Sequence, residues 1–200
     1  MQLNLNADDA LLEALSAKAD GAAEVLVERY GGRIYGMALR MMGNPADAQE
    51  VAKEALLTIY NKAGGFERRS AFSSWIYRVT ANAALMRLRK RKGQQDELSL
   101  ETLQEPLGES SRILEDWRRI PSNETLNREL GKVIQNAVRV LPDEYRVVLV
   151  MKDMEGQSLE EIASALELTL AAAKTRLHRA RMVVRKAVTD YLREGRRTTT

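Results

Sequence analysis

The chain has 200 residues, of which 44% are hydrophobic and 30% charged, as in a globular protein of one or two domains. It has no cysteine, which excludes disulfides, zinc–thiolate sites and thiol nucleophiles, and its single histidine has no metal-binding partner nearby in sequence. No apolar run approaches the roughly 18–20 residues of a membrane span, and the first residues lack an export-signal pattern. We therefore expect a cytoplasmic protein without membrane insertion and without cofactor or metal.

The net charge of +3 is distributed in blocks. Residues 78–92 contain six basic residues and no acid, residues 93–111 contain five acids and no base, and residues 171–186 contain six basic residues and the histidine. Two basic blocks around an acidic one indicate two nucleic-acid surfaces joined by a tether.

The hydrophobic pattern is helical nearly throughout, which predicts an all-α fold. In the N-terminal part, helices are predicted over 8–19 and 22–42, the second ended by Gly43. Asn44 and Pro45 are a cap and a first-turn proline, and they predict a third helix that ends at Gly64.

A long helix is predicted from residue 71 to about residue 92. Phe72 and Trp75 lie on its apolar stripe, so for them a core role is at least as well supported as DNA contact. A second stripe carries polar groups suited to nucleic acid, namely Arg78, Asn82 and Arg89.

After the linker-like segment 93–123, helices are predicted over 124–140 and from Leu141-Pro142 to Gly156. Ser158 and Glu161 then form a capping box, and Thr169 caps a second helix with a basic outer face. This pair is typical of a helix-turn-helix that binds duplex DNA. A solvated basic face on an ordinary helical hairpin is the simpler alternative.

Two blocks of the sequence resemble the extracytoplasmic-function (ECF) class of the bacterial sigma-70 family of RNA polymerase sigma factors. The resemblance is carried by short motifs, namely Arg29-Tyr30, Asn44-Pro45-x-Asp47-Ala48, Phe72-x-x-Trp75-Ile76-Tyr77-Arg78, Asn82, Leu141-Pro142, Glu155-Gly156-x-Ser158, Glu160-Glu161-Ile162-Ala163 and the run from Lys174 to Arg181. It implies two small helical domains joined by an acidic linker. The implied ranges are a sigma region 2-like domain over 1–92, the linker over 93–123, a sigma region 4-like helix-turn-helix domain over 124–194 and a tail over 195–200.

The resemblance implies a non-enzymatic specificity subunit associated with the nucleoid. Its partners would be the RNA polymerase core at the beta-prime clamp region, promoter DNA and an anti-sigma factor. Core binding maps by resemblance to Asp47, Gln49, Glu50, Lys53 and Glu54. Stabilisation of a helix start by carboxylates would alone explain Asp47 and Glu50, and both explanations can hold together.

The resemblance places contacts to the −10 element on the long helix, at Tyr77, Arg78, Asn82, Arg87, Arg89 and Lys90. Contacts to the −35 element fall on the second helix of the helix-turn-helix, at Ala172, Lys174, Thr175, Arg176, His178, Arg179 and Arg181. Its alanine-rich start predicts weaker direct base readout and more dependence on DNA shape. Glu167 stands where the family usually has glycine, at a cost of about 1 kcal/mol if the turn needs a positive φ.

A stand-alone helix-turn-helix regulator with an N-terminal sensing or dimerisation domain is the alternative function. An enzyme has little support, because no glycine-rich phosphate loop or paired catalytic motif is present. The acidic linker is either a solvated tether or, as the family implies, a segment that threads the polymerase cleft. It could also mask the basic helices before polymerase binds.

Overall fold

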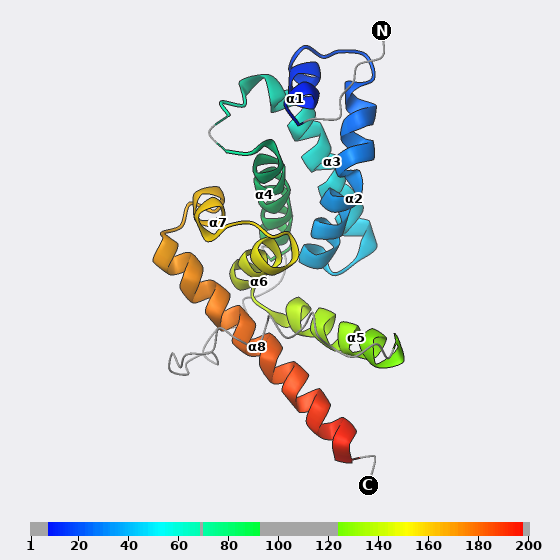
Figure 1. The fold of residues 1–200 in the computed structure, drawn as a ribbon, viewed down its shortest axis with the longest axis vertical. Helices are drawn as coiled ribbons and strands as arrows, with labels where there is room; N and C mark the ends of the chain where they lie inside the picture. Colours follow the sequence, from blue (N-terminus) through cyan, green and yellow to red (C-terminus); the bar gives the residue numbers. More distant parts are fainter. Residues whose placement is uncertain (1–7, 69, 93–123, 198–200) are drawn as a thin grey trace.

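The computed structural model describes residues 8–68, 70–92 and 124–197, and all regular structure in these ranges is helical. The all-α prediction is therefore confirmed. The predicted linker, residues 93–123, and the tail beyond residue 197 lie outside the described residues. Figure 1 shows an elongated molecule, with α1 at one end and the C-terminal half of α8 at the other.

The N-terminal half contains α1 (Asp8–Ser16), α2 (Ala22–Met42), α3 (Pro45–Lys62), the short η1 (Ala63–Gly65) and α4 (Phe72–Lys92). Helices α2 and α3 form a hairpin, and α4 packs against both. The predicted stop and start signals are confirmed. Gly43 ends α2 with a φ of 74°, which glycine adopts without strain. The Asn44 side chain accepts a hydrogen bond of 2.8 Å from the Asp47 backbone N–H at the start of α3.

The C-terminal half contains α5 (Glu124–Val140), α6 (Asp143–Leu149), η3 (Val150–Met154), α7 (Leu159–Ala165) and α8 (Leu170–Arg197). Pro142 precedes the first turn of α6 instead of lying in it. After Leu149 the chain widens into a turn of π-helix, η3, which the sequence pattern did not predict. Helix α8 packs against α5, α6 and α7, and so it holds this half together.

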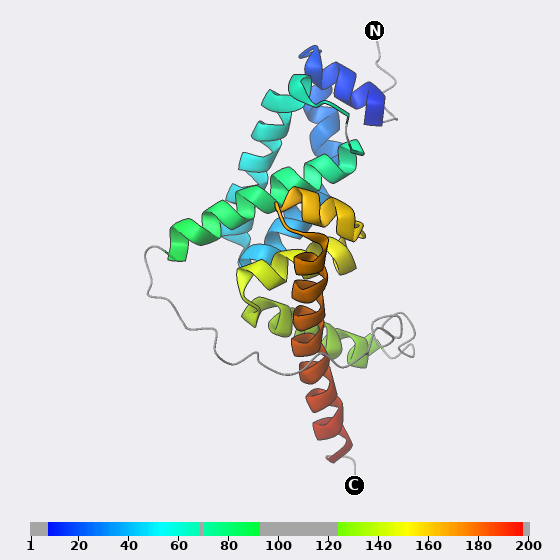
Figure 2. The ribbon, with the colours of Figure 1, turned by 90° about the vertical axis from the view of Figure 1, so that its left-hand side faces the viewer.

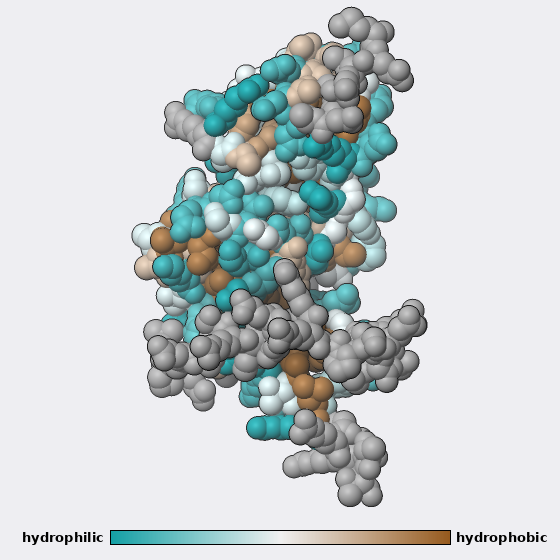
Figure 3. Space-filling view, in the orientation of Figure 1, coloured by the Kyte–Doolittle hydropathy of each residue, from teal (hydrophilic) through white to brown (hydrophobic). Residues whose placement is uncertain are grey.

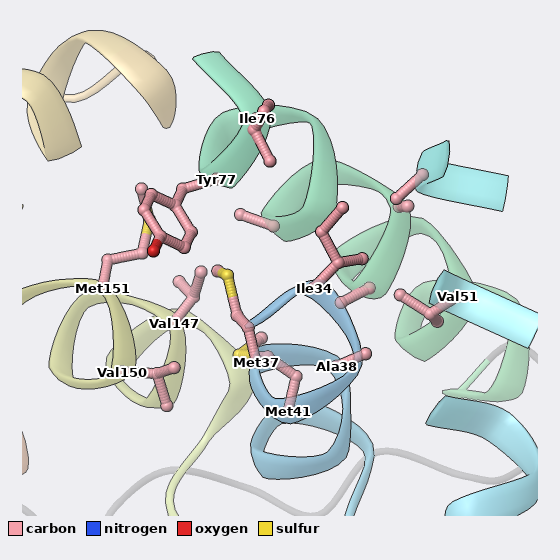
Figure 4. Close-up of a cluster of buried hydrophobic side chains, with 14 of the residues drawn as sticks. Ile34, Met37, Ala38, Met41, Val51, Ile76, Tyr77, Val147, Val150 and Met151 are labelled. Carbon is pink, nitrogen blue, oxygen red and sulfur yellow. The ribbon is translucent and has the colours of Figure 1, made fainter. Parts of the chain in front are cut away.

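The two halves share one hydrophobic core. Met37 and Met41 of α2 and Tyr77 of α4 meet Val147 of α6 and Met151 of η3, as Figure 4 shows. Each of these five side chains is at most 5% exposed. Two views at right angles place α6 and α7 directly beside α2 and α4 (Figures 1 and 2). The two helical units therefore form a closed arrangement.

Arg146 of α6 joins the halves through main-chain carbonyl groups. Its guanidinium is buried, with 7% of the residue exposed, and donates hydrogen bonds to the carbonyls of Val138, Arg139 and Leu141. A further bond of 2.6 Å reaches the Met41 carbonyl at the end of α2. Burial lowers the pKa of Arg146, and the nearby Asp143 carboxylate partly opposes this shift. One arginine thus satisfies carbonyl groups at the C-terminal ends of two helices, one in each half.

Candidate nucleic-acid and polymerase interfaces

The helix-turn-helix forms as the sequence predicts. The Ser158 hydroxyl accepts the Glu161 backbone N–H at 3.1 Å, and the Glu161 carboxylate accepts the Ser158 N–H at 2.8 Å. These reciprocal bonds form the predicted capping box at the start of α7. The Thr169 hydroxyl accepts the Ala172 N–H at 3.1 Å at the start of α8. The predicted stripe of α8 is buried, comprising Ala173, Leu177, Ala180 and Val184.

The turn between α7 and α8 places Glu167 in the left-handed region, with a φ of 56°. The Leu168 N–H bonds to the Ala163 carbonyl at 2.9 Å. This is the 6→1 bond of a Schellman motif, the one of its two hydrogen bonds that spans more residues. Such a turn favours glycine because the left-handed conformation costs other residues about 1 kcal/mol. The turn does need a positive φ at position 167, and it keeps helix-turn-helix geometry although glutamate occupies that position. The surface over this turn is partly apolar (Figure 3), and Leu170 is 36% exposed there.

Three arginines predicted to contact the −35 element make side-chain contacts within the C-terminal half. Arg176 forms an ion pair of 2.9 Å with Glu144 of α6, and Arg181 binds both carboxylate oxygens of Asp153 in η3. Arg179 donates to the Tyr145 hydroxyl at 3.2 Å. These contacts hold Arg176 and Arg181 on the two flanks of α8. At about 100° per residue, the side opposite the buried stripe carries Ala171, Thr175, His178, Arg179 and Met182, and Arg179 is exposed there.

Helix α4 divides the residues predicted to contact the −10 element into three groups. Asn82, Arg89 and Lys90 are exposed, and Arg78 is half-buried beside them. Arg87 instead donates two hydrogen bonds, of 2.9 and 2.7 Å, to one oxygen of Asp47. Tyr77 is only 5% exposed, because η3 and α6 cover it. Burial raises the pKa of Tyr77, and the nearby Glu155 carboxylate adds to the effect.

The aromatic residues at the start of α4 belong to the core. Phe72 stacks on Trp75 with ring centres 5.7 Å apart, and Phe66 packs against both rings. Tyr30 meets Phe72 edge-on at 6.1 Å. Since Phe72 and Trp75 are 5% and 7% exposed, the core interpretation of these two residues is confirmed.

The outer side of α3 brings together most of the residues predicted to bind polymerase. Gln49, Glu50, Lys53 and Glu54 are exposed there, and Leu57 among them is 63% exposed. A shallow groove of about 370 Å³ is lined by Glu50, Lys53, Glu54, Leu57, Thr58, Asn61 and Arg87. Lys53 pairs with Glu50 at 2.9 Å, and its hydrogen bond is the main reason that the pKa of Glu50 is lowered.

Asp47 is less available than its neighbours on α3. It contacts Asn44, Arg87 and, at 3.6 Å, Arg91. Hydrogen bonds from Asn44 and then Arg87 lower the pKa of Asp47. The structure thus joins a residue predicted to bind polymerase to one predicted to bind the −10 strand.

Sequence reasoning missed the polar contacts between the two halves. The Glu155 side chain, 7% exposed, pairs with Arg40 of α2 at 3.2 Å and lies near the Tyr77 hydroxyl. Arg33 of α2 lies near both Tyr77 and Glu155. Burial raises the pKa of Glu155, and Arg40 opposes that shift. No local sequence pattern marks these residues, because their partners lie far away in the chain.

Comparisons with known proteins match both halves of the chain. The model of sigma-70 region 2 matches residues 26–94, and that of sigma-70, region 4 matches residues 132–183. The ECF RNA polymerase sigma factor SigW of Bacillus subtilis is 34% identical, over 82% of this chain and 88% of the relative. The chain belongs to the ECF sigma factors. The RNA polymerase sigma-H factor of Pseudomonas aeruginosa is 29% identical to the present ECF sigma factor. The match covers 94% of the present chain and 97% of the Pseudomonas protein.

Solved structures of sigma factors share the fold of this ECF sigma factor. CnrH, in complex with the cytosolic domain of CnrY, matches 93% of the chain and 99% of its own, with a TM-score of 0.60 and 21% identity. The sigma factor RpoE in complex with the anti-sigma factor NepR, from Bartonella quintana, covers 79% of this chain and 91% of its own chain. Its TM-score is 0.56 and its sequence identity is 18%. Among the residues that the structure describes, none of the helices is long and apolar enough to cross a membrane. The same residues hold no cluster of three or more potential metal ligands.

Proposed function

We propose that this ECF sigma factor divides promoter recognition between α4 and α8 and binds the polymerase core through α3. The observation that carries the proposal is the position of exposed polar or cationic side chains on one side of α4 and of α8, in a chain whose two halves match sigma regions 2 and 4. The chain would act as a specificity subunit at the nucleoid in the cytoplasm and catalyse no reaction itself.

The α3 surface has the character of a protein-binding site. A large exposed apolar side chain, Leu57, lies among charged groups of both signs, which resembles an apolar contact surrounded by a polar rim. Carboxylates of Glu50 and Glu54 would pair with basic groups of the beta-prime clamp region. Asp47 would act mainly by holding Arg87 and the start of α3 in place.

Promoter opening would use the exposed stripe of α4. Arg89 and Lys90 supply cations for the phosphates of a displaced strand, and Asn82 supplies an amide that can hydrogen-bond to a base. Tyr77 can stack on a base only after the C-terminal half moves off it.

Reading of the −35 duplex would use the N-terminal part of α8. Thr175, His178 and Arg179 would face the groove, between Lys174 and Ala172, whose methyl group can contact a thymine methyl. Arg176 and Arg181 lie on the flanks and are held by side chains of α6 and η3, so they are placed to contact phosphates or the groove edge.

An anti-sigma factor is the expected inhibitor. Both solved neighbours were captured with a partner, the cytosolic domain of CnrY or the anti-sigma factor NepR. In the present chain the closed packing of the two halves covers Tyr77, and a partner that stabilises this packing would keep the −10 surface covered.

The proposal is tested by two variants with opposite effects. Glu50→Arg should abolish binding to core polymerase in a pull-down while −35 duplex binding by the C-terminal half persists. Arg176→Ala should leave core binding intact and weaken promoter use about equally for different −35 sequences, as expected for a contact to phosphate. Run-off transcription with core polymerase provides the readout. A stand-alone regulator would bind its operator without polymerase and produce no transcript, and that result would refute the proposal.

A further inference from the structure

Donor side chains of the N-terminal half gather around two carboxylates of the C-terminal half. Arg40 pairs with Glu155 at 3.2 Å, and Arg33 and the Tyr77 hydroxyl lie near the same carboxylate. One turn before Arg78, the Ser74 hydroxyl donates a hydrogen bond to the Glu161 carboxylate. Neither arginine of α2 belongs to the residues assigned to DNA above.

The chemistry of these donors is that of a phosphate-binding surface. Arginine guanidinium, serine hydroxyl and tyrosine hydroxyl groups are among the donors that hydrogen-bond to phosphate and sugar oxygens of nucleic acids. Carboxylates and phosphates use the same donors in similar geometry, and an arginine binds either through charge-assisted hydrogen bonds. The acids therefore occupy this surface as a nucleic-acid backbone would.

We propose that Arg33, Arg40, Ser74 and Tyr77 form a further contact site for the displaced −10 strand, and that Glu155 and Glu161 occupy it in place of phosphates while the chain is closed. This inference rests on the proposed −10 function of α4. It adds α2 to the DNA surface and makes the closed arrangement self-inhibiting.

The location of the four donors supports a continuous path for one strand. Ser74 and Arg78 lie one helical turn apart on α4, and Asn82 follows after another turn, so the three span about 12 Å along the helix. Tyr77 lies beside this line, where η3 covers it. A strand along Arg78 and Asn82 would thus meet the four donors once the C-terminal half had moved away.

The contact between Arg40 and Glu155 is one that a phosphate can replace. Burial raises the pKa of this carboxyl, so the closed arrangement disfavours its charged form despite Arg40. Opening the chain returns Glu155 to water and leaves Arg33 and Arg40 available to a phosphate. Replacing one anion by another keeps the arginines paired in both states.

The first experiment measures how holoenzyme binding to a fork-junction probe depends on salt. The probe carries an unpaired −10 strand from a promoter that the wild-type holoenzyme transcribes. Removing a side chain that neutralises one phosphate of a single strand should reduce the slope of log K against log salt by about 0.7. Arg40→Ala and Arg33→Ala should each show this reduction. Arg29→Ala, on the same helix but paired with Asp8 at 3.0 Å, should not.

Arg89→Ala separates failure of the inference from failure of the proposed function. If Arg89→Ala reduces the slope and the Arg33 and Arg40 variants do not, the further site is refuted and the −10 function of α4 stands. If none of the three variants changes the slope, the −10 function itself is refuted.

A second experiment examines the free chain. Because the sequence has no cysteine, Glu28→Cys and Asp190→Cys give two unique positions for a fluorescent pair, one on each half. Glu155→Lys places a cation against Arg33 and Arg40, which should separate the two halves. Energy transfer between the two dyes should therefore fall, and affinity for the single-stranded −10 oligonucleotide should rise several-fold. Glu160→Lys, the same charge change on an exposed residue of α7, is the control. Equal affinities of the two variants, or unchanged energy transfer in Glu155→Lys, would refute the inference.

Discussion

Arg87 of α4 binds a single carboxylate oxygen of Asp47 through two guanidinium nitrogens, at 2.9 and 2.7 Å. The pair links the helix predicted to meet the −10 strand to the helix predicted to meet polymerase. Asp47 also accepts a hydrogen bond from the Asn44 side chain at 2.7 Å. One side chain therefore stabilises the start of α3 and positions a cation of α4.

Asp47→Ala and Arg87→Ala should be coupled in a double-mutant cycle of urea unfolding. The Arg87 side chain is 39% exposed and that of Asp47 is 22% exposed, so water screens the pair. We expect a coupling free energy of about 0.5–1 kcal/mol. A matched cycle on Lys53 and Glu50, which are 68% and 51% exposed, should give less. Equal coupling in the two cycles would contradict this ranking.

Arg146→Met should lower the free energy of unfolding by about 3 kcal/mol. The substitution removes the donors to four main-chain carbonyl groups while preserving much of the side-chain volume, and buried acceptors without donors are costly. Arg146→Lys keeps the charge but lacks the planar fork, so its loss should be intermediate. Urea unfolding measures both, and a loss below about 1 kcal/mol for Arg146→Met would show that the carbonyls find other partners.

Glu167→Gly should raise the free energy of unfolding by up to about 1 kcal/mol, because glycine adopts the left-handed conformation without strain. The same change at Glu160, inside α7, should lower it by roughly 0.5–1 kcal/mol. Thermal and urea unfolding of the two variants should thus shift in opposite directions. A destabilised Glu167→Gly variant would mean that the Glu167 side chain makes a compensating contact.

Glu161 should make stability depend on pH in the acidic range. Its hydrogen bond from Ser74 is the main cause of a pKa below the ordinary value of 4.5. A lowered pKa in the folded state gives stability that is present above the ordinary value and is lost as pH falls through the lowered one. From about pH 5 to about pH 3, wild type should therefore lose more stability than Glu161→Gln. Glu155 titrates in the opposite sense but is present in both proteins, so it cancels in the difference; equal losses would contradict the prediction.

Local signals in the sequence predicted most helix starts and ends. Asn44, Ser158 and Thr169 cap the helices that they were expected to cap, because a cap depends on residues only three positions away. The buried stripe of α8 and the burial of Phe72 and Trp75 in α4 follow from helical spacing in the same way. The positive φ at Glu167 was left open by the sequence, which offered only the family's usual glycine at that position.

Contacts over long sequence distances could not be predicted in this way. Tyr77 looked like an exposed DNA contact because its cover, Met151 and Glu155, lies more than seventy residues further along the chain. No local pattern distinguishes Arg146 from other charged residues, and its acceptor at Met41 is 105 residues away. The assignments of individual residues to polymerase, −10 and −35 contacts remain predictions.

The π-helical turn η3 sets the rotational phase between α6 and α7. The Glu155 N–H bonds to the Val150 carbonyl at 3.0 Å, which accommodates one residue more than an α-helical turn does. Asp153 consequently points to Arg181 of α8, while Glu155, two positions later, points to Arg40 of α2. Deleting one residue here would rotate every later side chain by about 100° about the axis of this helical segment. The helix-turn-helix would still fold locally, but its acids would no longer be aligned with their partners in α2 and α4.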